Sequence, residues 1–245
     1  MGACQSMIPS RGVKRKSHVT TSALTAKMQM ALQLHLSEQK KLEHPMTLER
    51  ILLKFDKMQD VLGYVKDTFL ECSSDGHNLD FEGLQKALTA LKGKAPHEEE
   101  VREIFNFSDL DENVSISLKE FVVALVLAMV LDTMKFDEEK VTLAPSPRRQ
   151  SMSQPFFGHP KEIYNMLSLI LSAYLLFDIN GDGMIYMENV EKLLEESGHK
   201  SGGNAMLSQE RWKELDWDAN GTIDLAEFVN AFTMWVDIDE VLNSV

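Results

Sequence analysis

The stretch DWDANGTIDLAE, residues 216–227, decides the fold of this chain. Side chains that carry oxygen stand at its first, third, fifth and ninth positions, and a glutamate stands at the twelfth. Glycine at the sixth position permits a sharp turn, and the seventh position offers its backbone carbonyl. Calcium is a hard cation that takes about six to eight oxygen ligands, and this spacing wraps the loop around one ion. The expected ligands are Asp216, Asp218, Asn220, Thr222, Asp224 and Glu227.

Apolar residues flank this loop at helical spacing. Trp212 and Leu215 precede it, and Phe228 and Phe232 follow it, so each side predicts a helix with one buried face. A solvated acidic turn between two helices is the alternative. That alternative gives no reason for the agreement of so many specified positions, and the sequence therefore favours a calcium loop.

The helix–loop–helix pattern recurs, with four polar loops set between apolar helices. Within each pair of repeats the central apolar residues are 37 and 38 positions apart. We name the segments the first loop (72–83), the second loop (109–120), the third loop (178–189) and the fourth loop (216–227). At the eighth position of each loop a short strand contact is expected, which pairs Leu79 with Ile116 and Ile185 with Ile223.

The second loop, DLDENVSISLKE, offers an oxygen ligand at every required position. It departs from the pattern at Val114, because the sixth position needs a left-handed backbone, where a β-branched residue costs about 1–2 kcal/mol. A cost of that size weakens binding about tenfold, so we expect a weakened calcium site. A purely structural loop is the alternative. The candidate ligands are Asp109, Asp111, Asn113, Ser115 (through its carbonyl), Ser117 and Glu120.

The third loop, DINGDGMIYMEN, begins as a calcium loop but has Asn189 at the twelfth position. An amide gives one oxygen there and no bidentate carboxylate. Tyr186 at the ninth position is a poor ligand, and Glu188 stands one residue early unless the following helix shifts its register. Useful binding and weak or no binding both stay open. The candidate ligands are Asp178, Asn180, Asp182, Met184 (through its carbonyl) and Asn189.

The first loop, CSSDGHNLDFEG, lacks the calcium pattern. Cys72 takes the first position, and Gly76 and Gly83 take the fifth and the twelfth. We expect no ion in this loop. Its two helices are still needed, because they cover the apolar face of the neighbouring helix–loop–helix unit.

Taken together, these motifs resemble the EF-hand superfamily over roughly residues 47–240. The chain more narrowly resembles a plant group of calmodulin-like proteins with divergent loops and an extended N-terminus. The residues that carry this resemblance are 48–55, the DLDEN of the second loop with residues 119–121, and residues 214–221 with residues 226–240. It implies an all-α fold of two EF-hand pairs, with short strand pairing between loops and an N-terminal helical extension. The group usually has an acidic residue at the twelfth position of the third loop, and Asn189 departs from this.

Five segments are expected along the chain. Residues 21–39 show helical spacing, and a second helix is expected to begin near Thr47. The segments are a flexible basic anchor (1–20), N-terminal helices (21–57), the first EF-hand pair (58–136), a linker (137–160) and the second EF-hand pair (161–245).

Charge divides the chain into a basic head and an acidic body. The net charge is -13, yet residues 1–37 hold five basic residues and no acidic one. An acidic body repels phosphate groups, which disfavours nucleic acid as a partner. No apolar run is long enough to span a bilayer, and two cysteines make no disulfide framework, so a cytosolic location is expected.

The N-terminus carries the pattern of a lipid anchor. Gly2 with Ser6 fits N-myristoylation, and Cys4 is suited to palmitoylation. One acyl chain holds a membrane only marginally, and basic residues near an anionic surface add about 1 kcal/mol each. Ser17 and Ser151 stand near basic residues as candidate phosphorylation sites, and an unmodified tail is the alternative. The basic cluster is Arg11, Lys14, Arg15 and Lys16.

These features predict a calcium sensor held at the cytoplasmic face of the plasma membrane. Calcium would expose an apolar groove to a target protein, with an amphipathic helix as the expected ligand. Two alternatives stay open. One is a constitutive regulatory subunit of an enzyme, in the manner of calcineurin B-like proteins, and the other is a simple calcium buffer. No catalytic motif occurs in the sequence, so an enzyme is not expected.

Overall fold

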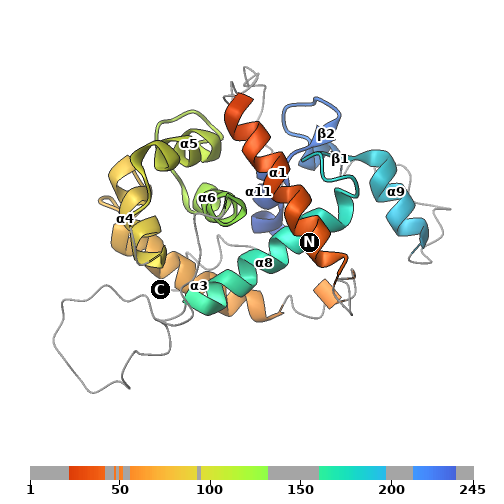
Figure 1. Ribbon diagram of the computed structural model, residues 1–245. Helices are drawn as coiled ribbons and strands as arrows, with labels where there is room; N and C mark the ends of the chain where they lie inside the picture. The colour runs from red at the N-terminus through yellow and green to blue at the C-terminus, as the bar shows by residue number, and fades with distance from the viewer. Residues whose placement is uncertain are drawn as a thin grey trace, which may run out of the picture.

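A computed structural model shows that the described part of the chain is α-helical, with one short two-stranded sheet (Figure 1). It describes residues 22–41, 47, 50–51, 56–92, 95–131, 160–196 and 212–235. The elements are α1 (Ser22–Gln39), α3 (Asp56–Cys72), α4 (Phe81–Lys92), α5 (Glu98–Ser108), α6 (Leu118–Val130), α8 (Pro160–Phe177), β1 (Ile185–Tyr186), α9 (Met187–Glu196), β2 (Thr222–Ile223) and α11 (Leu225–Trp235).

Helices α3 to α6 build the first pair of helix–loop–helix units. The N–H of Leu79 donates to the carbonyl of Ile116, and the N–H of Ile116 donates back to the carbonyl of Leu79, both at 2.8 Å. This bridge confirms the strand contact that the sequence predicts between the first and second loops. Both side chains are fully buried, so the bridge also closes the core beneath the two loops.

The second pair is joined in the same way by β1 and β2. These strands run antiparallel, with Ile185 opposite Ile223 and Tyr186 opposite Thr222. The pairing of the eighth positions is again the predicted one. Ile185 and Ile223 point into the core, and Tyr186 on the other face of the strand is exposed.

Helix α6 lies at the centre of the molecule and is buried along almost its whole length (Figure 1). It contacts α3 and α5 of the first pair and α8 and α11 of the second. The apolar run from Phe121 to Leu131 explains why this helix is buried. Because helices of both pairs pack on α6, the pairs share one hydrophobic core instead of forming separate lobes.

Aromatic rings fill this core on both sides of α6. Phe69 and Phe121 stack at a tilt in the first pair, with ring centroids 5.7 Å apart. Tyr174 and Phe228 meet edge to face in the second pair, with centroids 5.5 Å apart. Such pairs contribute about 0.5–1.5 kcal/mol beyond the area that they bury. Through Phe228, α11 is fixed directly behind the fourth loop.

The N-terminal helix that the sequence predicts is confirmed as α1, which packs on α6 and α8. Of the second predicted helix, residues 50–51 are helical, and α3 begins at Asp56. The predicted anchor (1–20) lies outside the described residues. So does the predicted linker except for Pro160, where α8 already begins.

None of the helices in the described ranges combines the length and apolar character that a bilayer-spanning helix requires.

Candidate metal centre

The fourth loop gathers three carboxylates around one point. It runs from a helical turn at 212–215 through β2 into α11. Asp216, Asp218 and Glu227 each offer an oxygen atom, and these atoms all lie within 4.8 Å of one another. Carboxylate oxygens at such separations are the ligands that calcium prefers. The fold therefore brings together the predicted first, third and twelfth positions.

Glu227 joins the two ends of this loop. One carboxylate oxygen accepts a hydrogen bond from the N–H of Trp217, and the other accepts from the N–H of Asp224, both at 3.0 Å. The N–H of Glu227 donates to the Asp224 carboxylate at 2.8 Å, which completes a reciprocal cap at the start of α11. With only 4% of its surface exposed, Glu227 is held in place as part of both the loop and the helix.

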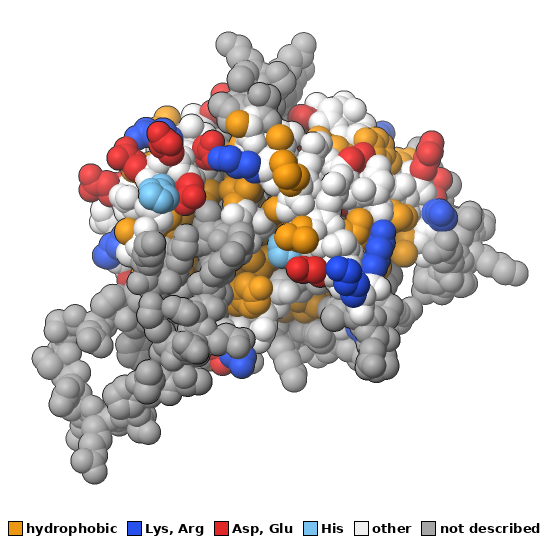
Figure 2. Space-filling model, in the orientation of Figure 1, with side chains coloured by type: hydrophobic (Ala, Val, Ile, Leu, Met, Phe, Trp, Pro, Cys, Tyr) orange, Lys and Arg blue, Asp and Glu red, His pale blue; other side chains and the backbone are white. Residues whose placement is uncertain are grey.

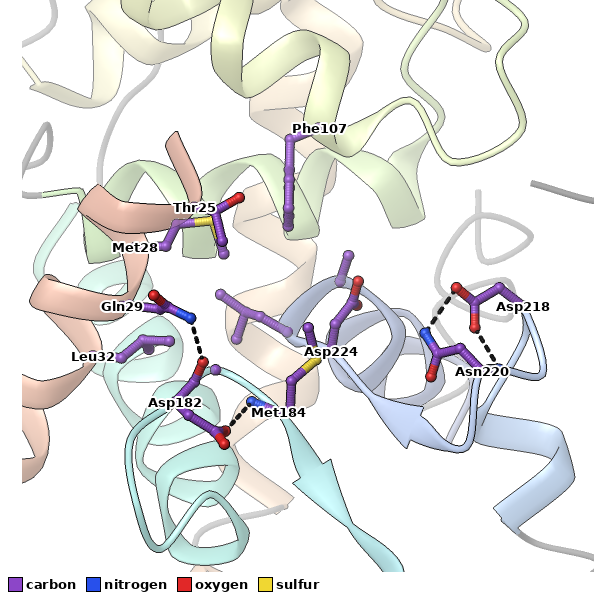
Figure 3. A pocket seen from close by; sticks show the side chains of 13 residues that line it. Thr25, Met28, Gln29, Leu32, Phe107, Asp182, Met184, Asp218, Asn220 and Asp224 are labelled. Carbon is purple, nitrogen blue, oxygen red and sulfur yellow. Dashed lines mark hydrogen bonds between the residues drawn. The ribbon is translucent and has the colours of Figure 1, made fainter. Parts of the chain in front are cut away.

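The turn of the fourth loop is held by Asp216. Its carboxylate accepts from the N–H groups of Asn220 and Gly221, each at 3.0 Å. Gly221 has a φ of 87°, in the left-handed region that glycine adopts without steric cost. The side-chain oxygen of Asn220 accepts from the N–H of Thr222 at 2.7 Å, and its amide donates to Asp218 at 2.9 Å (Figure 3). The predicted fifth and seventh positions thus lie beside the carboxylates.

Asp224 is the predicted ligand that stands apart from this cluster. The three-carboxylate group does not include it, and its side chain is engaged in capping α11. The ninth position of such a loop often reaches its ion through a water molecule. The position of Asp224 is therefore compatible with a ligand that reaches the ion through a water molecule.

The pKa of the Glu227 carboxyl is raised to about 7, chiefly by burial and in addition by the neighbouring carboxylates of Asp224 and Asp218. Hydrogen bonds from the backbone N–H groups of Asp224 and Asp218 act in the opposite direction. The net rise in the pKa of Glu227 results from negative charge gathered in a poorly solvated place. A divalent cation at the centre of the cluster removes this repulsion.

The second loop repeats the arrangement almost bond for bond. Asp109, Asp111 and Glu120 form a second cluster with ligand atoms within 4.8 Å of one another. Glu120 accepts from the N–H of Leu110 at 2.7 Å and from the N–H of Ser117 at 2.9 Å, as Glu227 does at the equivalent positions. Ser117 and Glu120 form a full capping box at the start of α6. Burial raises the pKa of the Asp109 carboxyl.

The turn of the second loop has the left-handed backbone that the sequence predicts at its sixth position. Val114 has a φ of 63° and is 76% exposed. Its N–H donates to the Asp109 carboxylate at 3.0 Å, and the side-chain oxygen of Asn113 accepts from the N–H of Ser115 at 2.7 Å. The loop therefore adopts the calcium-loop conformation in spite of the β-branched residue.

Comparisons with known proteins agree with this geometry. A family model described as an EF-hand domain pair matches residues 75–126. The chain is 29% identical over 227 residues to the probable calcium-binding protein CML21 of Arabidopsis thaliana, a match that covers 92% of this chain and 90% of that protein. It is 26% identical over 196 residues to the probable calcium-binding protein CML22 of the same plant, covering 79% and 80%.

These comparisons support a calmodulin-like EF-hand protein. Calcium is the ion that suits its two carboxylate clusters, because both offer only hard oxygen ligands. The two clusters belong to different EF-hand pairs.

The turn of the third EF-hand loop is stabilised by two carboxylates, whereas the second and fourth loops each bring three together. Asp178 is fully buried, and it accepts from the N–H groups of Gly181 at 2.9 Å and Gly183 at 3.0 Å. Burial raises the pKa of its carboxyl. Asp182 accepts from the amide of Asn180 at 2.8 Å and the hydroxyl of Tyr186 at 3.2 Å. Within the described ranges, no cluster of three acidic or other metal-binding groups includes this loop.

The register of α9 decides the question that the sequence leaves about Glu188. Helix α9 begins at Met187, which makes Asn189 its third residue, just as Glu227 is the third residue of α11. Glu188 is exposed, so the helix has not shifted to bring it inward. The twelfth position of the third EF-hand loop is therefore Asn189, and the loop has no bidentate carboxylate.

The first EF-hand loop is closed by a side chain in place of an ion. The Asp75 carboxylate accepts from the N–H groups of His77 at 2.7 Å and Asn78 at 2.8 Å, and from the hydroxyl of Ser73 at 3.0 Å. The backbone hydrogen bonds from Asn78 and His77 lower the pKa of Asp75 to about 2. Cys72, at the first position, is buried at the end of α3.

Sequence reasoning missed the residues that hold the third EF-hand loop from outside, which belong to α1. The amide of Gln29 donates to the carbonyl of Asp182 at 3.0 Å (Figure 3). The apolar spacing in residues 21–39 signals that one face of α1 is buried, but it does not identify the surface that this face covers. The lipidation candidates Gly2 and Cys4 and the phosphorylation candidates Ser17 and Ser151 lie outside the described residues.

Proposed function

We propose that this EF-hand protein is a calcium sensor that relays calcium binding to a target protein while its N-terminus holds it at a membrane. One observation carries the proposal most directly. Glu227 is at once a member of the fourth-loop carboxylate cluster and the third residue of α11, a helix that packs on α6 and α8. A change at the ion site is therefore transmitted to the central core.

The residues that would hold calcium follow from the fourth EF-hand loop. Asp216, Asp218 and Asn220 supply side-chain oxygens, Thr222 supplies its carbonyl, and Glu227 supplies two oxygens. Asp224 would act through water. Calcium supplies positive charge that neutralises the crowded carboxylates, and the protein supplies a loop already folded around the site. The second EF-hand loop would hold an ion in the same manner.

The strand pairing supports a sensor over an isolated site. Ile185 and Ile223 link the third and fourth EF-hand loops, so movement in one loop displaces the other. A groove that opens on the core side of α11 would accept an amphipathic helix of the target. Both Arabidopsis relatives are named as probable calcium-binding proteins, which agrees with this role for the ion.

Membrane attachment rests on the sequence. The N-terminal Gly2, Cys4 and basic cluster together supply the two signals that stable anchoring needs. The proposed location is the cytoplasmic face of the plasma membrane. Co-expression with an N-myristoyltransferase, followed by intact mass measurement of wild type and Gly2→Ala, tests the first signal. A mass shift absent in both proteins would refute it.

Calorimetric titration with calcium tests the metal sites. Glu227→Gln keeps the shape of the side chain but removes its charge, so the strongest binding step is expected to disappear. Glu120→Gln is the matched change in the second EF-hand loop, and it should remove only the weaker step. A wild-type protein that shows no heat with millimolar calcium would end the proposal.

Binding of an apolar dye separates the sensor from the two alternatives. A sensor exposes apolar surface when calcium is added, and Glu227→Gln does not. A buffer shows calcium heat but no calcium-dependent dye binding. A constitutive subunit stays with its enzyme when the native protein is purified in chelator.

A further inference from the structure

Helix α1 contacts the third EF-hand loop. Besides the hydrogen bond from Gln29 to the Asp182 carbonyl, α1 approaches the turn of the loop closely. A Cβ atom on Gly181 would lie 3.2 Å from Cγ of Gln33 and 3.3 Å from Cδ2 of Leu36. Gly181 also has a φ of 69°, so the loop presents bare backbone to the helix. This loop lacks a twelfth-position carboxylate, and it is instead held by a helix from the other end of the chain.

The buried face of α1 has the pattern of a helix bound in a groove. Leu24, Met28 and Leu32 are four residues apart, lie on one face and are 9% exposed or less. Beside them is a cavity of about 260 Å³ between α1, Phe107, the third EF-hand loop and the fourth EF-hand loop (Figure 3). Helix α1 therefore occupies an apolar groove but does not fill it.

The same cavity reaches the calcium ligands. Asp218, Asn220 and Asp224 line it from one side, and Met28 of α1 lines it from another (Figure 3). The hydroxyl of Thr222 also contacts the sulfur of Met184 in the third EF-hand loop at 3.6 Å. Rearrangement of the fourth EF-hand loop around an ion thus changes one wall of a cavity that α1 also lines.

The polar contacts between α1 and other elements include, in the described residues, the Gln29 bond, an ion pair and a hydrogen bond from the Gln39 amide to the Ser172 hydroxyl at 2.8 Å. Lys27 pairs with Glu103 of α5 at 3.1 Å, but the lysine side chain is 56% exposed, and exposed pairs contribute little.

The helix also has a second apolar face. On the outer face, Met30 is 69% exposed and Leu34 is 59% exposed. Figure 2 shows apolar side chains at the surface along the path of α1. Helix α6, by contrast, is buried on all sides.

We propose that α1 is an intrachain ligand of this groove, and that calcium in the fourth EF-hand loop releases it so that a target helix takes its place. The inference rests on the proposed function, because it names what occupies the groove before the target does. The target helix would repeat the chemistry of α1. It would present apolar side chains four residues apart, with a basic residue placed as Lys27 is to meet Glu103.

Calcium binding and the docking of α1 must influence each other reciprocally, and this gives a first test on the full chain. If calcium weakens the docking of α1, then weakening that docking must strengthen calcium binding by the same factor. Gln29→Ala removes one hydrogen bond to the third EF-hand loop, so calcium affinity is expected to rise by up to about fivefold. Leu34→Ala, on the exposed face of the same helix, is the matched control and should leave the affinity unchanged. An unchanged or lower affinity in a folded Gln29→Ala protein overturns the proposal.

Zero-length cross-linking gives a second test, in which the main measurement is made on the wild-type protein. A water-soluble carbodiimide joins Lys27 to Glu103 when α1 is docked, because their charged atoms are 3.1 Å apart. The yield of the cross-linked peptide in wild type, measured by mass spectrometry, should fall several-fold with calcium. It should not fall in Glu227→Gln, and Lys27→Arg should give no product.

The outcomes separate the two proposals. Calcium heat with an unchanged cross-link overturns the release of α1 and leaves the sensor standing. Absence of calcium heat in wild type overturns both.

Discussion

Val114 and Gly221 occupy the same position in two EF-hand loops and share a left-handed backbone, with φ values of 63° and 87°. The valine holds this conformation although its side chain is 76% exposed and gains little from burial. The steric cost is therefore present whether or not an ion is bound. This steric cost lowers the stability of the folded second EF-hand loop. It has a smaller effect on calcium affinity, because the loop already has the strained conformation before the ion binds.

Val114→Gly is expected to raise the free energy of unfolding by about 1 kcal/mol, because relief of left-handed strain exceeds the added flexibility of the unfolded chain. Chemical denaturation without calcium measures this change. Val114→Ala keeps a Cβ atom and should gain much less. Equal stabilities for the glycine variant and wild type would show that the strain is relieved elsewhere.

The raised pKa of Glu227 predicts that calcium displaces a proton. In the calcium-free fold this pKa is about 7, against an ordinary value of 4.5. Glu227 therefore stabilises the calcium-free fold below pH 4.5, and that contribution is lost as the pH rises through about 7. Calcium must expel the proton, so its affinity falls by up to about tenfold for each pH unit below 7.

Calorimetry at pH 6 in two buffers with different ionisation enthalpies measures the proton released. Close to one proton per ion is expected in wild type, and Glu227→Gln should release none. Identical binding heats in the two wild-type titrations would contradict the raised pKa.

Tyr174 places a hydroxyl in the core without a hydrogen-bond partner in the described part of the chain. Burial raises the pKa of this phenol well above its ordinary value, and the carboxylates of Asp178 and Asp224 raise it further. Removing an unpartnered buried hydroxyl relieves a desolvation cost, so Tyr174→Phe should leave the free energy of unfolding unchanged or raise it by about 1 kcal/mol. Urea denaturation measures this, and a clear loss would reveal a bound water molecule.

Local patterns in the sequence predict much of this protein. The ligand positions of the fourth EF-hand loop, the contacts of Leu79 with Ile116 and Ile185 with Ile223, and helix α1 all follow from spacings within short segments. Such spacings record which face of an element is buried. They do not record what covers it, because that depends on segments far apart in the chain.

The docking of α1 illustrates this limit. Gln29 and Asp182 are 153 positions apart, and neither residue type signals the other. The hydrophobic core that the two EF-hand pairs share likewise depends on contacts between distant segments. The sequence predicts that α6 is buried, but packing alone determines that helices of both EF-hand pairs meet on it.

The two degenerate EF-hand loops differ in whether one substitution restores a calcium site. Asn189 is already in the register of Glu227 at the third position of its helix, so Asn189→Glu adds the missing carboxylate where an ion needs it. Calorimetry should then show one additional binding event, weaker than that of the fourth loop because Tyr186 occupies the ninth position. Asn189→Gln has the same shape without charge and should add none. An unchanged number of binding events in the glutamate variant would contradict this.

The equivalent change in the first EF-hand loop should fail. A Cβ atom on Gly83 would lie 2.8 Å from the carbonyl oxygen of Cys72, which is backbone and cannot move aside like a flexible side chain. Gly83→Glu is therefore expected to lower the free energy of unfolding by about 1–3 kcal/mol and to add no calcium heat. Gly83→Ala should lower it by a similar amount, because the overlap begins at Cβ. A stable Gly83→Glu protein with an additional calcium site would show that the first loop is limited by its ligands and not by its packing.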